Sequence, residues 1–155
     1  MTMKRTSFKL LLGTLLALAL FSVAELAAAS GQYLEDDQYI VHYSAFNASM
    51  LTPQVAKAYD LNRSRQRGVL SIAVQRKQPE GPPVPVMAQL KGFTGQLGGS
   101  EIPLKFQLVE EGKAIYYLAQ FLIDDGETLD FDVKIRPTPE YPPMALSFSQ
   151  IFFEE

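Results

Sequence analysis

Three arginines at alternate positions are the strongest candidate for a binding site in this sequence. Arg63, Arg65 and Arg67 are spaced by two residues, so an extended segment would place all three guanidinium groups on one side. Each guanidinium offers a planar fork of donors that suits a carboxylate or a phosphate. We expect either a docking site for an acidic partner or anionic ligand, or arginines that pair with this protein's own carboxylates.

His42 is the only histidine, and it is the residue best suited to act as a general base at neutral pH. A hydrolase built around it needs a nucleophile within hydrogen-bond reach, and Ser44 and Ser49 lie nearby in the sequence. Ser44 shares the strand face of His42 and points beside it, and no G-x-S-x-G motif is present. We interpret His42 as a weak candidate polar site and favour a histidine that is hydrogen-bonded on a sheet face.

Metal and paired-carboxylate chemistry find little support among the remaining residues. One histidine and no cysteine exclude the usual zinc ligand sets and thiolate chemistry. Asp124, Asp125 and Glu127 surround a glycine without the spacing of a calcium loop, so we predict a solvated hairpin turn. Asp130 and Asp132 alternate with apolar residues, which places them on an outer sheet surface and not across a cleft. We expect no cofactor and no catalysis.

The N-terminus has the three parts of a secretory signal peptide. A basic start is followed by an uncharged run rich in leucine and alanine, which ends in three consecutive alanines. We predict cleavage between Ala29 and Ser30, which divides the chain into a signal peptide, residues 1–29, and one mature domain, residues 30–155. The apolar run is shorter than the ~20 residues that span a bilayer. We therefore expect no permanent membrane anchor, with an uncleaved N-terminal anchor as the alternative.

The mature domain is small, acidic and free of cysteine. Without residues 1–29 it has 126 residues, with 11 basic and 16 acidic side chains and a net charge of −5. A domain of this size buries roughly two-thirds of its unfolded surface, and its core alone must hold it together. A net negative charge does not attract nucleic acid or anionic lipid, so we expect neither as a partner. Export without disulfides favours the bacterial periplasm.

Apolar residues at every second position predict an all-β domain. The clearest strand is residues 128–136, where four apolar side chains alternate with four charged ones. About seven strands are expected in total, at residues 39–46, 68–77, 84–94, 101–110, 113–123, 128–136 and 145–153. The segment 110–112 should form a hairpin turn. We also expect a break or bulge near Gly92 and Gly95 and a bulge near Gln150.

One short helix should follow the first strand. Thr52 is a suitable N-cap and Pro53 suits the first helical position, with Val55, Ala56 and Tyr59 at helical spacing behind them. Two proline-rich segments later in the chain are expected to be extended connections, because proline cannot donate to a sheet ladder. This pattern is typical of an antiparallel immunoglobulin-like β-sandwich, with a closed barrel as the alternative.

The first half of the mature domain resembles a known family. YIVHYSAFN at residues 39–47, LTPQVAKAY at residues 51–59 and NRSRQRGVLSIAV at residues 62–74 are similar to the opening of bacterial exported proteins of domain of unknown function 4426. The resemblance runs through most of the mature chain and is most specific over residues 39–74. It implies a periplasmic β-sandwich from a Gram-negative bacterium, and it implies no activity, substrate or catalytic residue.

The sequence favours a non-enzymatic periplasmic module that binds an unknown protein or small ligand. It would act through loops, an exposed strand edge or the arginine segment. One alternative is a small-ligand carrier with an apolar cavity of roughly several hundred cubic ångströms between the sheets or under the proline-rich segments. Another alternative is a hydrolase, which requires a serine hydroxyl or a carboxylate within about 3 Å of His42.

Overall fold

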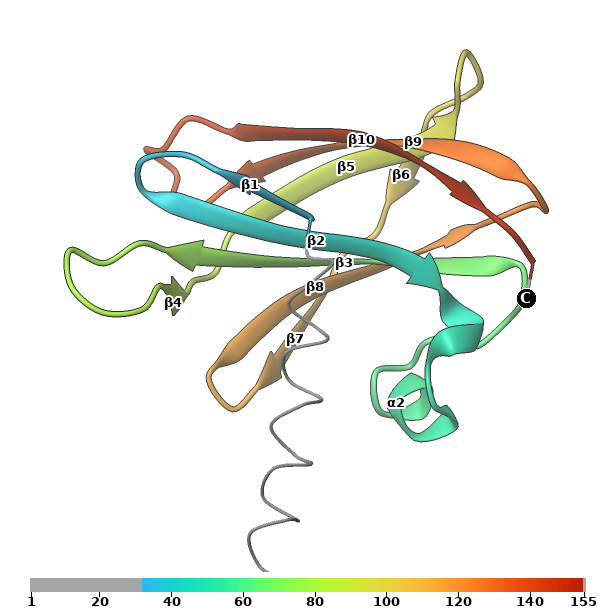
Figure 1. Ribbon diagram of the computed structural model, residues 1–155, viewed down its shortest axis with the longest axis horizontal. Helices are drawn as coiled ribbons and strands as arrows, with labels where there is room; N and C mark the ends of the chain where they lie inside the picture. The colour runs from blue at the N-terminus through green and yellow to red at the C-terminus, as the bar shows by residue number, and fades with distance from the viewer. Residues whose placement is uncertain (1–31, 155) are drawn as a thin grey trace, which may run out of the picture. The chain divides into compact units, whose positions relative to one another are not determined.

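In the computed structural model, residues 32–154 are described, and they form two antiparallel sheets with a common core. Figure 1 shows β9 and β10 in one layer and β2, β3 and β8 in the other. The predicted signal peptide, residues 1–29, and its cleavage site lie outside these residues. Within the described part of the chain, no helix is long and apolar enough to span a bilayer.

Sheet A has the strand order β1-β2-β3-β8-β7, with the short β4 paired to β3. Its strands are β1 (Gln32–Glu35), β2 (Tyr39–Asn47), β3 (Arg67–Arg76), β4 (Val84–Pro85), β7 (Gln107–Glu111) and β8 (Ala114–Leu122). Sheet B has the order β10-β9-β5-β6. Its strands are β5 (Gln89–Gln96), β6 (Ile102–Leu104), β9 (Glu127–Arg136) and β10 (Met144–Phe152).

The core is made by the inward faces of both sheets. Phe131 of β9 is buried, stacks on Phe148 at 4.7 Å between ring centroids and meets Phe121 of sheet A edge-on at 4.9 Å. Leu129, Val133 and Ile135 are buried on the same face of β9, as their alternation predicts. The prediction of an all-β protein built from antiparallel sheets is therefore confirmed.

Residues 32–154 contain ten strands, where the sequence predicted about seven. The short β1 lies where the sequence predicted no strand, and the predicted strands at 84–94 and 101–110 are each divided in two. In both cases the chain changes sheets: β4 pairs in sheet A and β5 in sheet B, while β6 pairs in sheet B and β7 in sheet A. An apolar pattern does not reveal such a crossing, because both sheets bury their residues in one core.

The predicted bulges are wrong, because β9 pairs with β5 and with β10 in continuous register. A Cβ on Gly92 would lie 2.9 Å from Cγ2 of Val133, so this glycine permits close packing inside an unbroken strand. Gln150 occupies an inward-facing position of β10, and its Nε2 donates to the carbonyl of Ala45 at 2.9 Å. A polar residue in the inward row, and not a register slip, interrupts the apolar alternation.

Of the two predicted hairpin turns, one is confirmed and one is wrong. Strands β7 and β8 pair directly across the turn at Gly112, which has a φ of 58°. The turn at residues 124–126 is tight, with the amide of Glu127 donating to the carbonyl of Asp124 at 3.1 Å. It joins β8 of sheet A to β9 of sheet B, however, and so connects the sheets instead of forming a hairpin.

Candidate functional site

The segment between β2 and β3 packs over the outer face of sheet A, and we call residues 48–63 the cover segment. It contains the 3-10 helix η1 (Ala48–Met50) and the helix α2 (Pro53–Ala58). Helix α2 begins as predicted, with Oγ1 of Thr52 accepting from the amide of Val55 at 3.3 Å. Ala56 is buried outside the core between the sheets, so α2 has a small apolar contact of its own.

Side chains of β7 and β8 hold the cover segment in place. Nε2 of Gln107 donates to the carbonyl of Tyr59 at 2.8 Å. Gln120 makes two bonds to the backbone of Asn62, accepting from its amide at 2.9 Å and donating to its carbonyl at 2.8 Å. The hydroxyl of Tyr59 also donates to the carboxylate of Glu111. These bonds fix Tyr59 and Asn62, so they hold the second half of the cover segment against sheet A.

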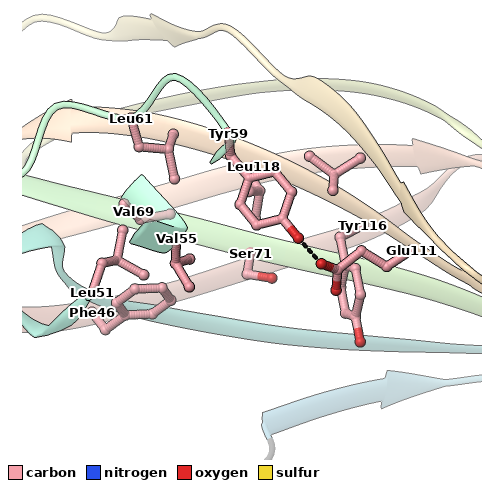
Figure 2. A pocket seen from close by; sticks show the side chains of 11 residues that line it. Phe46, Leu51, Val55, Tyr59, Leu61, Val69, Ser71, Glu111, Tyr116 and Leu118 are labelled. Atoms are coloured by element: carbon pink, nitrogen blue, oxygen red, sulfur yellow. Dashed lines mark hydrogen bonds between the residues drawn. The ribbon is translucent and has the colours of Figure 1, made fainter. Parts of the chain in front are cut away.

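A cavity of about 180 Å³ lies between the cover segment and sheet A (Figure 2). Its walls are mostly apolar, and they include Phe46, Leu51, Val55, Leu61, Val69 and Leu118. Val55 and Tyr116 are partly exposed, so the cavity opens to solvent on one side. A buried apolar cavity of about 150 Å³ can hold benzene. This pocket is therefore large enough for one aliphatic or aromatic side chain.

The rim of this pocket carries polar groups and a free strand edge. The Ser71 hydroxyl and the Glu111 carboxylate line it, and Glu110 is exposed on the opposite face of β7. The only ion pair within residues 32–154 joins Lys77 and Glu35, at 3.0 Å, so neither glutamate has a basic partner there. Strand β7 ends sheet A and pairs only with β8 among the described strands. Its second backbone edge is available to an extended chain.

The three arginines do not share one extended segment, so the premise of that prediction is wrong. Residues 64–67 form a turn in which the amide of Arg67 donates to the carbonyl of Ser64 at 3.3 Å. Nε of Arg63 donates to the carbonyl of Leu51 at 2.7 Å and stabilises the cover segment. Arg65 is exposed, and Arg67 begins β3. None pairs with a carboxylate in the described chain, and a docking role for them stays a prediction.

His42 is exposed on the outer face of sheet A. Its Nε2 lies 3.2 Å from Oε1 of Gln75, and the ring of Tyr33 lies 6.5 Å away between centroids. Neither Ser44 nor Ser49 is hydrogen-bonded to the imidazole in this part of the chain. This is the geometry of a histidine on a sheet face, and among residues 32–154 no hydroxyl or carboxylate is hydrogen-bonded to its ring.

A second hollow, of about 450 Å³, lies beside the proline-rich segment that precedes β10. Leu34, Tyr141 and Met144 line it together with Asp36. It lies near the start of β2, whereas the pocket beneath α2 lies near its end. The volume of this hollow lies within the range of small-molecule sites.

Asp36 organises the polar side of this second hollow. One carboxylate oxygen accepts from the amides of Gln38 and Tyr39 at 2.8 Å, and the other accepts from the Tyr141 hydroxyl at 2.9 Å. Partial burial acts to raise the pKa of Asp36, but these hydrogen bonds and the charge of Lys77 outweigh it and lower the pKa. Burial and the bond to Asp36 raise the pKa of Tyr141. This cluster was not predicted from the sequence. A local signal was present, because an aspartate in a turn often accepts hydrogen bonds from the amides that follow it, here those of Gln38 and Tyr39.

Metal ligands are not grouped in the described residues. No three His, Cys, Asp or Glu side chains between residues 32 and 154 lie where they could hold one ion.

Comparisons with known proteins identify a family and solved structures with a similar fold. The family profile for "Domain of unknown function (DUF4426)" matches residues 34–155. A DUF4426 family protein from Pseudomonas aeruginosa PAO1 is 37% identical, with a TM-score of 0.68 over 81% of this chain and 96% of that chain. No curated protein matches the sequence.

Two structures of FetP from uropathogenic Escherichia coli strain F11 share the fold at only 10% identity. One, expressed recombinantly in the periplasm of E. coli, has a TM-score of 0.55 over 79% of this chain and 93% of FetP. The other, a copper-bound variant, has a TM-score of 0.57 over 81% of this chain and 97% of FetP.

Proposed function

This chain belongs to the DUF4426 family, and we propose that it is a non-enzymatic periplasmic module that binds an extended segment of a partner protein. The signal-like N-terminus and the absence of cysteine support export. The FetP structure obtained from the periplasm is compatible with this compartment for the fold. We also assign the sandwich to the immunoglobulin-like class, on its two antiparallel sheets.

This proposal rests on one observation: an apolar pocket, large enough for one side chain, lies beside the unpaired edge of β7. Val109 and Glu111 of β7 line the pocket, and the outer edge of β7 is unpaired among the described strands. In strand addition, main-chain hydrogen bonds to such an edge supply affinity, and pockets for side chains supply specificity. A partner strand on β7 could place one apolar side chain beneath α2.

The charge at the rim defines the partner further. Glu111 lines the pocket, is exposed and has no basic partner in the described chain. A lysine or arginine two residues from the apolar anchor, on the same face of the partner strand, would meet this carboxylate. The proposed ligand is therefore an extended segment with one apolar residue flanked by basic residues.

The size of the pocket explains why the ligand should be a segment and not a free small molecule. Burying one leucine or phenylalanine side chain stabilises a complex by about 1.5–3 kcal/mol. A dissociation constant of 1 mM already requires about 4.1 kcal/mol. The pocket alone is thus too small for useful affinity, and backbone pairing with β7 must contribute the remainder.

Filling the pocket tests this proposal with a matched control. Ser71→Phe places a ring in the pocket, whereas Ser44→Phe adds the same ring at the position paired with Ser71 on β2, outside the pocket. We expect a blocked peptide, lysine-threonine-leucine-threonine-lysine, to shift the amide signals of Val69 and Val109 in NMR titrations. Replacing its leucine by alanine should weaken binding by about 10–100-fold, because the leucine burial is lost.

Ser71→Phe should abolish these shifts, and Ser44→Phe should leave them unchanged. Thermal unfolding of both variants verifies that each is folded. Equal binding by Ser71→Phe and the wild-type protein, or no binding of the peptide to the folded wild-type protein at millimolar concentration, would contradict the proposal.

A small-ligand carrier is the second candidate, and the hollow of about 450 Å³ beside Tyr141 favours it. The core between the sheets is filled by residues such as Phe131, so a ligand would bind at this end of the sandwich. Copper binding is a property of the FetP variant and forms no part of either proposal.

A further inference from the structure

The outer face of sheet B separates positive from negative charge along its strands. The cationic half has Lys91 of β5 directly opposite Lys134 of β9, followed by Arg136 opposite Gln89. The acidic half has Asp130 and Asp132, which precede Lys134 on β9. All three cationic side chains are exposed.

The acidic half is concave and its carboxylates are held in place. Oγ of Ser147 donates to Asp132 and Oγ of Ser149 donates to Asp130, both at 2.5 Å. The loop between β5 and β6 brings Glu101 to the same hollow, which has a volume of about 270 Å³. Each carboxylate therefore faces a hollow that a long basic side chain can enter.

The pairing of two lysines is unfavourable within one copy of the chain, and in its described part only Lys91 has a compensating contact, with its Nζ 5.9 Å from the centroid of the Phe93 ring. Like charges directly opposite each other in a sheet are destabilising, and Lys91 and Lys134 occupy such a pair. Neither they nor Arg136 form an ion pair with any carboxylate of residues 32–154. One acidic residue in place of either lysine would remove this repulsion within the chain. The two lysines therefore indicate a partner whose carboxylates lie opposite them.

The face is complementary to itself. A two-fold axis parallel to the plane of sheet B and perpendicular to β9, passing above the face between Asp132 and Lys134, would turn the cationic half of one copy onto the acidic half of another. We propose that this face of sheet B binds a second copy of this chain, forming an isologous dimer in which Lys91, Lys134 and Arg136 enter the acidic hollow of the partner. This proposal is independent of the pocket beneath α2, which lies on sheet A.

The dimensions of the face set the expected affinity. Three strands of about nine residues cover roughly 30 Å by 15 Å, so the two copies would bury about 900 Å² in total. Stable interfaces usually bury about 1,200–2,000 Å². The dimer should thus be weak, and it should dissociate as salt screens its charges.

Charge exchange between the two halves tests the proposal by sedimentation equilibrium. Lys91→Glu with Lys134→Glu makes the face mainly acidic, with Arg136 left of its three cations, and Asp130→Lys with Asp132→Lys makes it mainly basic, with Glu101 left of its three carboxylates. At an ionic strength of about 0.01 M, where charges act over about 30 Å, the wild-type protein should dimerise. Each double variant alone should dimerise at least tenfold more weakly, and the two mixed together should form a heterodimer.

Two controls separate this interface from the effect of net charge. Lys57→Glu with Lys113→Glu makes the same change in net charge on exposed positions outside sheet B, and it should leave dimerisation unchanged. The variant with all four exchanges keeps the wild-type net charge and should regain the homodimer. If the basic variant does not fold, comparing the acidic variant with the control at 57 and 113 gives the same answer. A wild-type protein that is monomeric at low salt and millimolar concentration would overturn the proposal, as would folded double variants that do not associate when mixed.

Discussion

The polar residues that organise this protein are those whose side chains bond to backbone atoms. Of the candidates from the sequence, His42 bonds to a glutamine side chain, whereas Arg63 bonds to the carbonyl of Leu51 and stabilises the cover segment. Asp36, which was not among those candidates, binds two amides and a tyrosine hydroxyl. It connects the turn between β1 and β2 to the proline-rich segment before β10, and so joins the edges of the two sheets.

Asp36 should make stability depend on pH in the acidic range. Its pKa is lowered from the ordinary value of 3.8, so the unfolded chain binds the proton more readily. The stabilisation is fully present above the unfolded pKa and is lost as pH falls through the folded pKa. We expect Asp36→Asn to be less stable than the wild-type protein at pH 7, with a difference that shrinks as pH falls below about 4. Urea unfolding followed by circular dichroism at several pH values measures this, and a constant difference would contradict it.

The cover segment shows how a short helix depends on its surroundings. Helix α2 has only six residues, too few to be stable alone in water. It is held by its N-cap and by the bonds from Gln107 and Gln120 to the backbone that follows it. The sequence predicted where this helix begins, because capping is a local interaction. It did not predict the pocket, because the facing walls come from β3, β7 and β8.

Removing the N-cap should weaken the cover segment. Thr52→Ala deletes the acceptor for the Val55 amide and should lower the free energy of unfolding by about 1 kcal/mol. Thr52→Ser keeps the hydroxyl and should restore most of it. Hydrogen exchange at Ala56 and Tyr59 should become faster in Thr52→Ala, because their amides bond within the helix. Unchanged exchange in Thr52→Ala would mean that the bonds to the sheet alone hold the segment.

Across the whole domain, stability depends on one core shared by both sheets. Phe131 is 1% exposed and contacts aromatic rings of both sheets. Phe153, near the C-terminus, is 53% exposed and bonds to Asn47 only through its carbonyl. These two phenylalanines therefore differ in burial while having the same side chain.

Phe131→Ala should destabilise the domain far more than Phe153→Ala. Loss of a buried phenylalanine costs about 3–5 kcal/mol, since a cavity remains that the sheets cannot close. Phe153→Ala should change the free energy of unfolding by less than about 1 kcal/mol. Chemical denaturation of both variants measures the difference. A similar loss in both would show that the core is not continuous between the sheets.

The sequence alone determined the properties that depend on neighbouring residues: the alternation that makes strands, the N-cap of α2, the tight turn at Gly112 and the resemblance to the family. Other properties required the tertiary structure. The division of predicted strands between two sheets and the pocket beneath α2 depend on contacts between distant residues. The turn of residues 64–67, which separates the arginines, is local, but the spacing of the arginines alone did not distinguish it from an extended segment. Period-two patterning shows which side chains are buried, but both sheets bury theirs in the same core, so the pattern cannot show which sheet a strand joins.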